Sequence, residues 1–162
     1  MILYLLRHGH AVNVGENNVR CDFDRMLTGE GKEKVRQVVK AVKRTGKNPE
    51  KIFTSPLVRA METAEIAADE LDCKEVEKND ELAPCGDHRE LIRFLRNSEI
   101  KSAMLVGHMP DLSELACRLI SRKNDAQIHF KKAGLCCVSF DGELSEGEGL
   151  LEFLIQPANI IS

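Results

Sequence analysis

The chain has 162 residues, of which 43% are hydrophobic and 30% charged, and 23 Lys and Arg against 26 Asp and Glu give a formal charge of −3. A chain of this length normally forms one domain, so we expect a single domain over residues 1–162. The composition excludes the fibrous and disordered classes, and the charge balance excludes an overall basic surface, so no nucleic-acid partner is expected.

The first part of the chain alternates short apolar runs with helical patterns. Met1–Leu6 is almost wholly apolar, as a central buried strand would be. Thr28 can cap a helix that runs to about Thr45, because valines recur there at three- and four-residue spacing. Residues 52–54 form a short second strand, and Ser55-Pro56 then open another helix, with the serine as its cap.

The middle of the chain continues this alternation. Residues 74–78 are a polar strand candidate that suits a sheet edge, and the turn-rich residues 79–87 follow it. A helix is expected over 88–97, and a buried strand over 103–107. Pro110 then starts a further helix, because proline is well placed in a first helical turn.

The last third changes character. Residues 134–140 and 149–155 are two apolar segments separated by an acidic, glycine-containing stretch, which predicts two closing strands joined by a turn. Taken with the alternation before them, they predict an α/β fold. We expect a three-layer sandwich in which helices cover both faces of a mainly parallel central sheet.

The N-terminal apolar run also bears on the compartment. Met1–Leu6 is too short to cross a membrane and lacks the basic start of a secretory signal. We therefore expect a cytoplasmic protein with no membrane partner. In that reducing compartment the cysteines are expected to be reduced and structural, as small buried thiols. They are Cys21, Cys73, Cys85, Cys117, Cys136 and Cys137.

Chemically useful side chains stand where three predicted strands end. Arg7 and His8 follow the first strand, Arg59 lies one helical turn after the second, and His108 follows the strand over 103–107. Parallel sheets bind ligands beyond the carboxyl ends of their strands. Guanidinium groups suit phosphoryl oxygens, and a neutral imidazole can serve as nucleophile. The pattern favours an anion site for phosphoryl transfer, although Arg7-His8 alone could equally be polar residues that end a strand.

Five segments, in order, resemble the histidine phosphatase superfamily, also called the phosphoglycerate mutase-like family. They are LRHGHA at 6–11, RMLTGEG at 25–31, TSPLVRAMETA at 54–64, ELAPCGD at 81–87 and LVGHMP at 105–110. The resemblance spans residues 1 to roughly 140. The short PCGD segment at 84–87, with no long insertion after the third strand, is similar to the small phosphohistidine phosphatase branch, the SixA type.

The resemblance implies a phosphoglycerate mutase-like fold and a role for each matching residue. His8 would accept the phosphate covalently, and Arg7, Arg59 and a protonated His108 would bind and stabilise it. The implied substrate is phosphohistidine on a protein. A small phosphomonoester is the alternative substrate, and a phosphate-binding module without turnover is a third reading. No cofactor and no metal are expected.

The general acid is where the sequence departs from the longer branches of the superfamily, which carry a glutamate in a region missing here. Glu81 and Asp87 are the nearest candidate acids or bases, yet each could instead cap a helix or line a turn. An alkoxide leaving group needs a proton from the enzyme, whereas a protonated phosphoimidazole can leave as neutral imidazole. A pocket weak in general acid should therefore prefer P–N to P–O cleavage.

The remaining polar residues leave alternatives open. Arg25 could reach the phosphate or a partner protein, or it could be a solvated loop residue. His10 lies two positions after His8, but nothing supports a metal site there. The roles of Arg20 and Cys85 stay open. So does the oligomeric state, with a monomer favoured.

Overall fold

The computed structural model describes residues 1–123 and 125–160, and six of its segments form one sheet. The strands are β1 (Ile2–Arg7), β2 (Lys51–Thr54), β3 (Val76–Lys78), β4 (Ser102–Gly107), β5 (Leu135–Ser139) and β6 (Leu150–Ile155). Their order across the sheet is β3-β2-β4-β1-β5-β6. The first four run parallel, whereas β5 and β6 are antiparallel to their neighbours. The predicted mainly parallel sheet and the two closing strands are confirmed.

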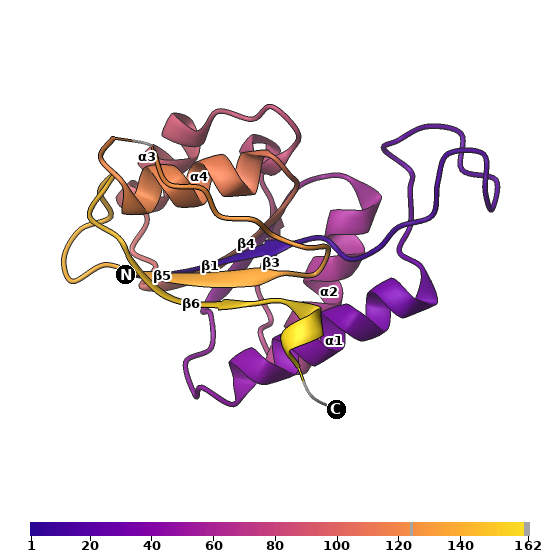
Figure 1. Cartoon of the computed structure of the whole chain (residues 1–162), viewed down its shortest axis with the longest axis horizontal. Coiled ribbons are helices and arrows are strands. Elements are labelled where there is room, and N and C mark those ends of the chain that lie inside the picture. The colour runs from indigo at the N-terminus through magenta and orange to yellow at the C-terminus, as the bar shows by residue number, and fades with distance from the viewer. Residues whose placement is uncertain (124, 161–162) are drawn as a thin grey trace.

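Helices cover both faces of this sheet, as predicted (Figure 1). The four α-helices are α1 (Gly29–Lys43), α2 (Val58–Leu71), α3 (His88–Asn97) and α4 (Asp111–Ile120), and two short 3-10 helices are η1 (Asp80–Leu82) and η2 (Pro157–Asn159). In Figure 1, α3 and α4 lie on one side of the strands, and α1 and α2 on the other. The three-layer α/β sandwich is therefore confirmed.

The central strand β1 explains why the chain begins with an uninterrupted apolar run. Successive side chains of a strand point to opposite faces, so Leu3 and Leu5 join the core under α3 and α4. Tyr4 and Leu6 join the core under α1 and α2. A strand buried on both faces has no polar side to alternate with. Its pairing with β4 places Arg7 opposite Gly107, so both strands deliver their next residues to one edge of the sheet.

The predicted helix boundaries hold except at α2. Thr28 caps α1, and its hydroxyl accepts the N–H of Gly31 at 3.0 Å. The helix expected from Ser55-Pro56 begins only at Val58, after Leu57 as its N-cap residue, so the prediction of a serine cap is wrong. The hydroxyl of Ser55 is instead 2.7 Å from a ring nitrogen of His108. The same hydroxyl accepts the N–H of Leu57 at 3.3 Å, so it joins a local turn to the tertiary contact with His108.

The cysteines match the expectation only in part. All six, which lie within the described residues, are free thiols. Cys117, Cys136 and Cys137 are buried, and burial raises the pKa of the Cys137 thiol to about 11. Cys21 and Cys85 are exposed, so the prediction of small buried thiols is wrong for them.

None of the helices in the described part of the chain combines the length and apolar character that a membrane crossing requires.

Candidate active site

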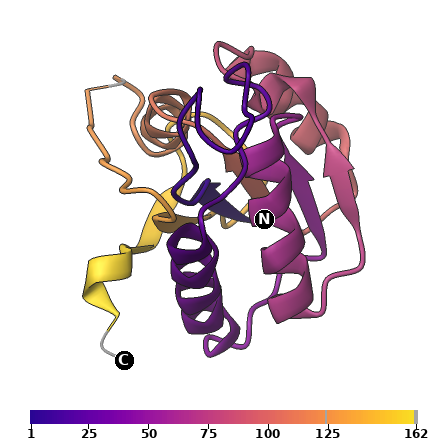
Figure 2. The same cartoon turned by 90° about the vertical axis from the view of Figure 1, so that its right-hand side faces the viewer.

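Two histidines meet at the carboxyl ends of β1 and β4. The rings of His8 and His108 have centroids 5.1 Å apart and planes tilted by 53°. Both are nearly inaccessible to solvent, at 7% and 3% exposed. The loop that links β1 to α1 extends beyond the end of β1 in Figure 1, and Figure 2 shows it standing above the strand ends next to α2. The two imidazoles therefore lie together at the edge where parallel sheets bind ligands.

Backbone contacts on both sides fix the position of His8. Its N–H donates to the carbonyl of Gly107 at 3.1 Å, and its carbonyl accepts the N–H of Ala133 at 3.0 Å. The next residue, Gly9, donates its N–H to Thr63 on α2 at 3.2 Å. A Cβ on Gly9 would lie 2.9 Å from the carbonyl oxygen of Gly31, so a side chain has no room there. The motif after β1 thus packs tightly against both neighbouring strands and two helices.

The hydrogen bonds of the His8 ring determine where its proton lies. Nδ1 is 2.7 Å from the carbonyl oxygen of Gly9, and a carbonyl oxygen only accepts, so Nδ1 carries the proton. Nε2 accepts the Nε–H of Arg59 at 3.3 Å and so presents a lone pair. Burial first, and the nearby charges of Arg59 and Arg7, lower the pKa of His8 to about 3. His8 is therefore a neutral imidazole near pH 7, with Nε2 as its nucleophilic atom.

Arg59 connects this ring to a carboxylate that the sequence analysis missed. Arg59 projects from the first turn of α2, and its side chain is only 6% exposed. Its Nη1 donates to the backbone carbonyl of Asp22 at 2.7 Å, and its Nη2 donates to the Asp22 carboxylate at 3.0 Å. Hydrogen bonding to Arg25 and then to Arg59 holds the pKa of Asp22 below its usual value. Asp22 is therefore ionised at neutral pH.

Arg25 lies on the same loop and contacts Asp22, and its expected role in binding the substrate stays a prediction. Its Nη1 donates to the Asp22 carboxylate at 3.0 Å, and its Nε donates to the carbonyl of Val12 at 2.7 Å. The path of this loop depends on tertiary packing, and the three-residue spacing of Asp22 and Arg25 was the one local signal that paired them.

Arg20 is exposed on the loop. His10 is exposed as well, and its Nδ1 lies 3.4 Å from the Thr28 hydroxyl.

Two buried polar atoms at the site have no hydrogen-bond partner among the described residues. They are Nε of Arg7 and Nδ1 of His108. Nη1 of Arg7 donates to the carbonyl of Phe130 at 2.7 Å, and Nε2 of His108 lies 2.7 Å from the Ser55 hydroxyl oxygen. A buried polar atom without a partner is costly, and two such atoms in one site are available to a ligand. Arg7 is cationic, and an anion is the ligand that this pair fits.

The charge of His108 differs from the expectation. Burial, followed by the neighbouring guanidinium of Arg59, lowers the pKa of His108 to about 4. In the unliganded site at neutral pH the His108 imidazole is therefore neutral, and its protonation when a phosphoryl group is bound stays a prediction. The sequence places a histidine at this strand end, but its protonation depends on burial and on a cation that arrives from a different helix.

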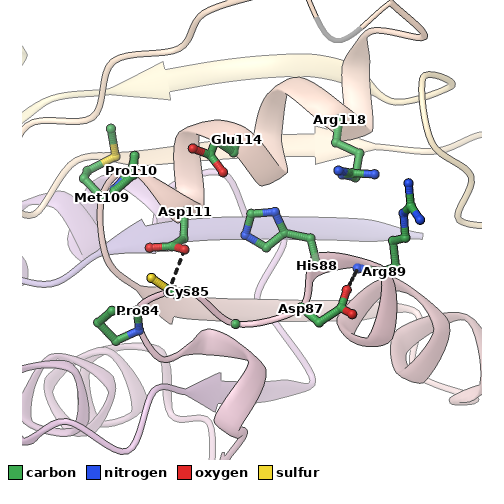
Figure 3. A pocket seen from close by; sticks show the side chains of 11 residues that line it. Pro84, Cys85, Asp87, His88, Arg89, Met109, Pro110, Asp111, Glu114 and Arg118 are labelled. Atoms are coloured by element: carbon green, nitrogen blue, oxygen red, sulfur yellow. Dashed lines mark hydrogen bonds between the residues drawn. The ribbon is translucent and has the colours of Figure 1, made fainter.

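A groove of about 670 Å³ lies beside the site, between the segment 84–89 and the start of α4 (Figure 3). The Asp87 carboxylate lines this groove and caps α3 by accepting the N–H groups of Arg89 at 2.8 Å and Glu90 at 3.3 Å. The Glu81 carboxylate accepts the N–H of Asp87 at 2.6 Å. The Glu81 carboxylate thus holds the loop before α3, and the Asp87 carboxylate holds the first turn of α3. Their role as acid or base stays a prediction, and these contacts do not favour it.

Cys85 is exposed in the same groove, and its N–H donates to the Asp111 carboxylate at 3.0 Å. Figure 3 shows the His88 ring between Asp111 and Arg118. Among the described residues, no group of three or more His, Cys, Asp or Glu side chains is arranged to hold a metal ion.

Comparisons with known proteins point to one family. The sequence model of the histidine phosphatase superfamily (branch 1) matches residues 3–86. An uncharacterised protein of Picosynechococcus sp. is 36% identical over 139 residues, which cover 83% of this chain and 82% of that protein. Phosphohistidine phosphatase SixA of Escherichia coli (strain K12) is 26% identical over 164 residues, which cover 99% of this chain and 96% of the relative.

Solved structures show the same fold. A protein histidine phosphatase SixA complexed with tungstate superposes with a TM-score of 0.86 at 25% identity, covering 99% of this chain and 100% of that one. A phosphoserine phosphatase mutant from Entamoeba histolytica, in complex with phosphoserine, superposes with a TM-score of 0.68 at 15% identity, covering 99% of both chains. The second likeness concerns the fold alone.

Proposed function

The chain belongs to the histidine phosphatase superfamily, and from this membership and the geometry of the site we propose that it removes phosphate from phosphohistidine on a protein. The reaction would pass through a covalent phosphohistidine on His8. The observation that carries the proposal is the neutral His8 ring, whose Nε2 lone pair faces Arg59 while Nδ1–H is held by the carbonyl of Gly9. A nucleophile in this state needs no base to remove a proton.

The proposed reaction has two steps at Nε2. In the first, the lone pair of His8 Nε2 forms a bond to phosphorus, the P–N bond of the substrate breaks, and the substrate ring, protonated at its other nitrogen, leaves as neutral imidazole. In the second, a water oxygen attacks phosphorus, the electron pair of the P–Nε2 bond returns to His8, and both protons of the water stay on the phosphate that leaves. The Gly9 carbonyl stabilises the positive charge on the His8 ring between the two steps.

Hydrogen-bond donors around the site, two of them cationic, would stabilise the transferred phosphoryl group. Nε of Arg7 and Nδ1 of His108 have no partner among the described residues, and Arg59 already contacts the nucleophile. Preorganised donors of this kind are effective in a buried site because they need little reorganisation. Since Arg7 and Arg59 supply the positive charge, we propose turnover that requires no metal ion. Activity in the presence of a chelator is the expected result.

The state of the carboxylates favours a P–N bond over a P–O bond as the one cleaved. Hydrogen bonds from Arg25 and Arg59 keep the Asp22 carboxylate ionised. The Glu81 and Asp87 carboxylates accept hydrogen bonds from backbone N–H groups. None is placed as a protonated acid beside the nucleophile. An alkoxide leaving group would require such an acid, whereas a protonated imidazole does not. The relative in Escherichia coli is named a phosphohistidine phosphatase, which agrees with this choice.

We further propose that residues 1–162 work as one domain, because both cores pack against the same sheet. The proposed partner is a protein that presents phosphohistidine on its surface. Localisation in the cytoplasm and a monomeric state stay predictions.

The test compares hydrolysis of a phosphohistidine peptide with that of p-nitrophenyl phosphate and phosphoserine. We expect preference for the peptide, retention of activity in a chelator, and an acid-labile phosphoryl label on the wild-type protein. His8→Ala should abolish both activity and label, whereas His10→Ala, at an exposed histidine two residues away, should retain them. A preference for the esters would overturn the proposed substrate, and a fully active His8→Ala variant would overturn the mechanism.

A further inference from the structure

Lys132 stands beside the candidate phosphate site on the segment that precedes β5. Two hydrogen bonds tie this segment to the end of β1. Nη1 of Arg7 donates to the carbonyl of Phe130 at 2.7 Å, and the N–H of Ala133 donates to the carbonyl of His8 at 3.0 Å. Lys132 lies between these two anchored residues, so its backbone is held next to the Arg7-His8 peptide.

The conformation of Ala133 shows that packing imposes this arrangement. Ala133 is buried and adopts a φ of 61°, in the left-handed region that alanine rarely occupies. The local sequence would not choose that conformation. The packing around Ala133 therefore stabilises the turn that carries Lys132.

Lys132 is half-buried, and the charged groups that shift its pKa are cationic. Burial, then the guanidinium groups of Arg7 and Arg25, lower the pKa of Lys132. Arg25 and Arg59 share the Asp22 carboxylate. Neither Arg7 nor Lys132 forms an ion pair with an acidic side chain among the described residues. Like charges held together in this way are unfavourable until an anion binds between them. The partnerless Nε of Arg7 independently indicates that a ligand belongs there.

We propose that Lys132 is a phosphate-binding residue of this site, whose ammonium group donates to the transferred phosphoryl group alongside Arg7. The inference rests on the proposed function for the identity of the ligand. The strand order β2-β4-β1-β5 places Arg59 and Lys132 on opposite sides of His8. Arg59 approaches from the helix after β2, and Lys132 from the segment before β5, so together they would hold the phosphoryl group from two sides.

The neighbouring lysine provides a matched control. Lys131 is exposed, and its N–H donates to the side chain of Gln156 at 2.9 Å. Its carbonyl accepts the N–H of Gly134 at 2.8 Å. Lys131 and Lys132 therefore carry the same charge on the same turn, but Lys132 is half-buried beside the end of β1 whereas Lys131 is exposed.

The experiment measures the affinity of the protein for inorganic phosphate and for tungstate by calorimetry. Lys132→Met is expected to weaken both by about tenfold, the effect of losing a hydrogen bond between charged groups. Lys131→Met should change these affinities by no more than about twofold, because Lys131 lies away from the site. Lys132→Arg should change them by no more than about threefold, because arginine keeps the positive charge. Lys132→Gln serves if the methionine variant does not fold.

Turnover separates this inference from the proposed function. If Lys132 contacts the phosphoryl group, kcat/KM for a phosphohistidine peptide and for p-nitrophenyl phosphate should fall by the same factor in Lys132→Met. Unchanged phosphate affinity in a folded Lys132 variant would overturn the inference, and so would a loss restricted to the peptide. A wild-type protein that prefers esters would refute the proposed substrate, yet the tenfold loss of phosphate affinity would still support the role of Lys132.

Discussion

Arg59 donates its Nε–H to Nε2 of His8 across 3.3 Å, and the same guanidinium binds Asp22 with its other two nitrogens. One side chain thus joins the candidate nucleophile to a carboxylate of the loop after β1. An incoming phosphate carries the same kind of charge as Asp22 and needs the same donors. Carboxylate and phosphate should therefore compete for Arg59.

Replacement of Asp22 tests this competition. Asp22→Asn should raise the affinity for inorganic phosphate by roughly threefold to tenfold, a modest effect because the Asp22 side chain is 59% exposed and its ion pair is screened by solvent. Asp24→Asn removes the same charge two residues away and should leave the affinity unchanged. Calorimetric titration measures both. Weaker phosphate binding in Asp22→Asn would show that the carboxylate supports the site rather than competing for it.

Binding of an anion should change the protonation of His108. Its pKa of about 4 reflects burial and Arg59, and a bound dianion would raise it toward neutrality. Tungstate binding near pH 6.5 should therefore take up protons, measurable by calorimetry in buffers of different ionisation enthalpy. The uptake should disappear in His108→Asn. Equal heats in all buffers for the wild-type protein would contradict this coupling.

The two buried histidines also predict how stability depends on pH. Their pKa values, about 3 for His8 and about 4 for His108, lie below the unfolded value of about 6.5, so the unfolded chain binds more protons as the pH falls. The stabilisation is complete above pH 6.5 and is lost as the pH decreases toward 4. At pH 5 each histidine should lower the free energy of unfolding by on the order of 2 kcal/mol relative to pH 7.

Denaturant unfolding at pH 7 and pH 5 measures this loss. The decrease in the free energy of unfolding should be smaller in His108→Asn than in the wild-type protein. His129→Asn, at an exposed histidine, should behave as the wild type does. The same decrease in all three proteins would refute the assignment of the loss to His108.

Two glycines in the first turn of α1 separate close packing from helix propensity. A Cβ on Gly31 would lie 2.2 Å from the carbonyl oxygen of His10, whereas a Cβ on Gly29 would meet nothing within 4 Å. Gly31→Ala should therefore destabilise the protein by about 2 kcal/mol or more and weaken phosphate binding, because the loop after His8 must move. Gly29→Ala should be neutral or slightly stabilising. Thermal and denaturant unfolding distinguish the two, and equal stabilities would contradict the close contact.

The convergence of His8, Arg59 and His108 could be predicted because their positions follow from strand ends. Neighbouring parallel strands finish at one edge of a sheet, so residues that follow buried apolar runs meet there whatever the loops do. A helix at about 88–97 was predictable as well, since Asp87 is a candidate local cap and the structure shows it capping α3. These features depend on short-range patterns in the sequence.

Asp22, Ser55 and the neutral state of His108 could not be predicted in the same way. The contact between Asp22 and Arg59 joins residues 37 positions apart through a loop with no regular structure. Ser55 has the local signature of a helix cap but is within hydrogen-bonding distance of His108. The pKa of His108 depends on burial by elements from several parts of the chain. Each of these features is set by tertiary packing.

The hydrogen bond between Nδ1 of His8 and the carbonyl of Gly9 has a further consequence for regiochemistry. The nitrogen that keeps its proton cannot attack, so phosphorylation of this ring would yield a single isomer, substituted at the nitrogen remote from the backbone. Phosphorus NMR of the trapped protein should show one resonance rather than a mixture.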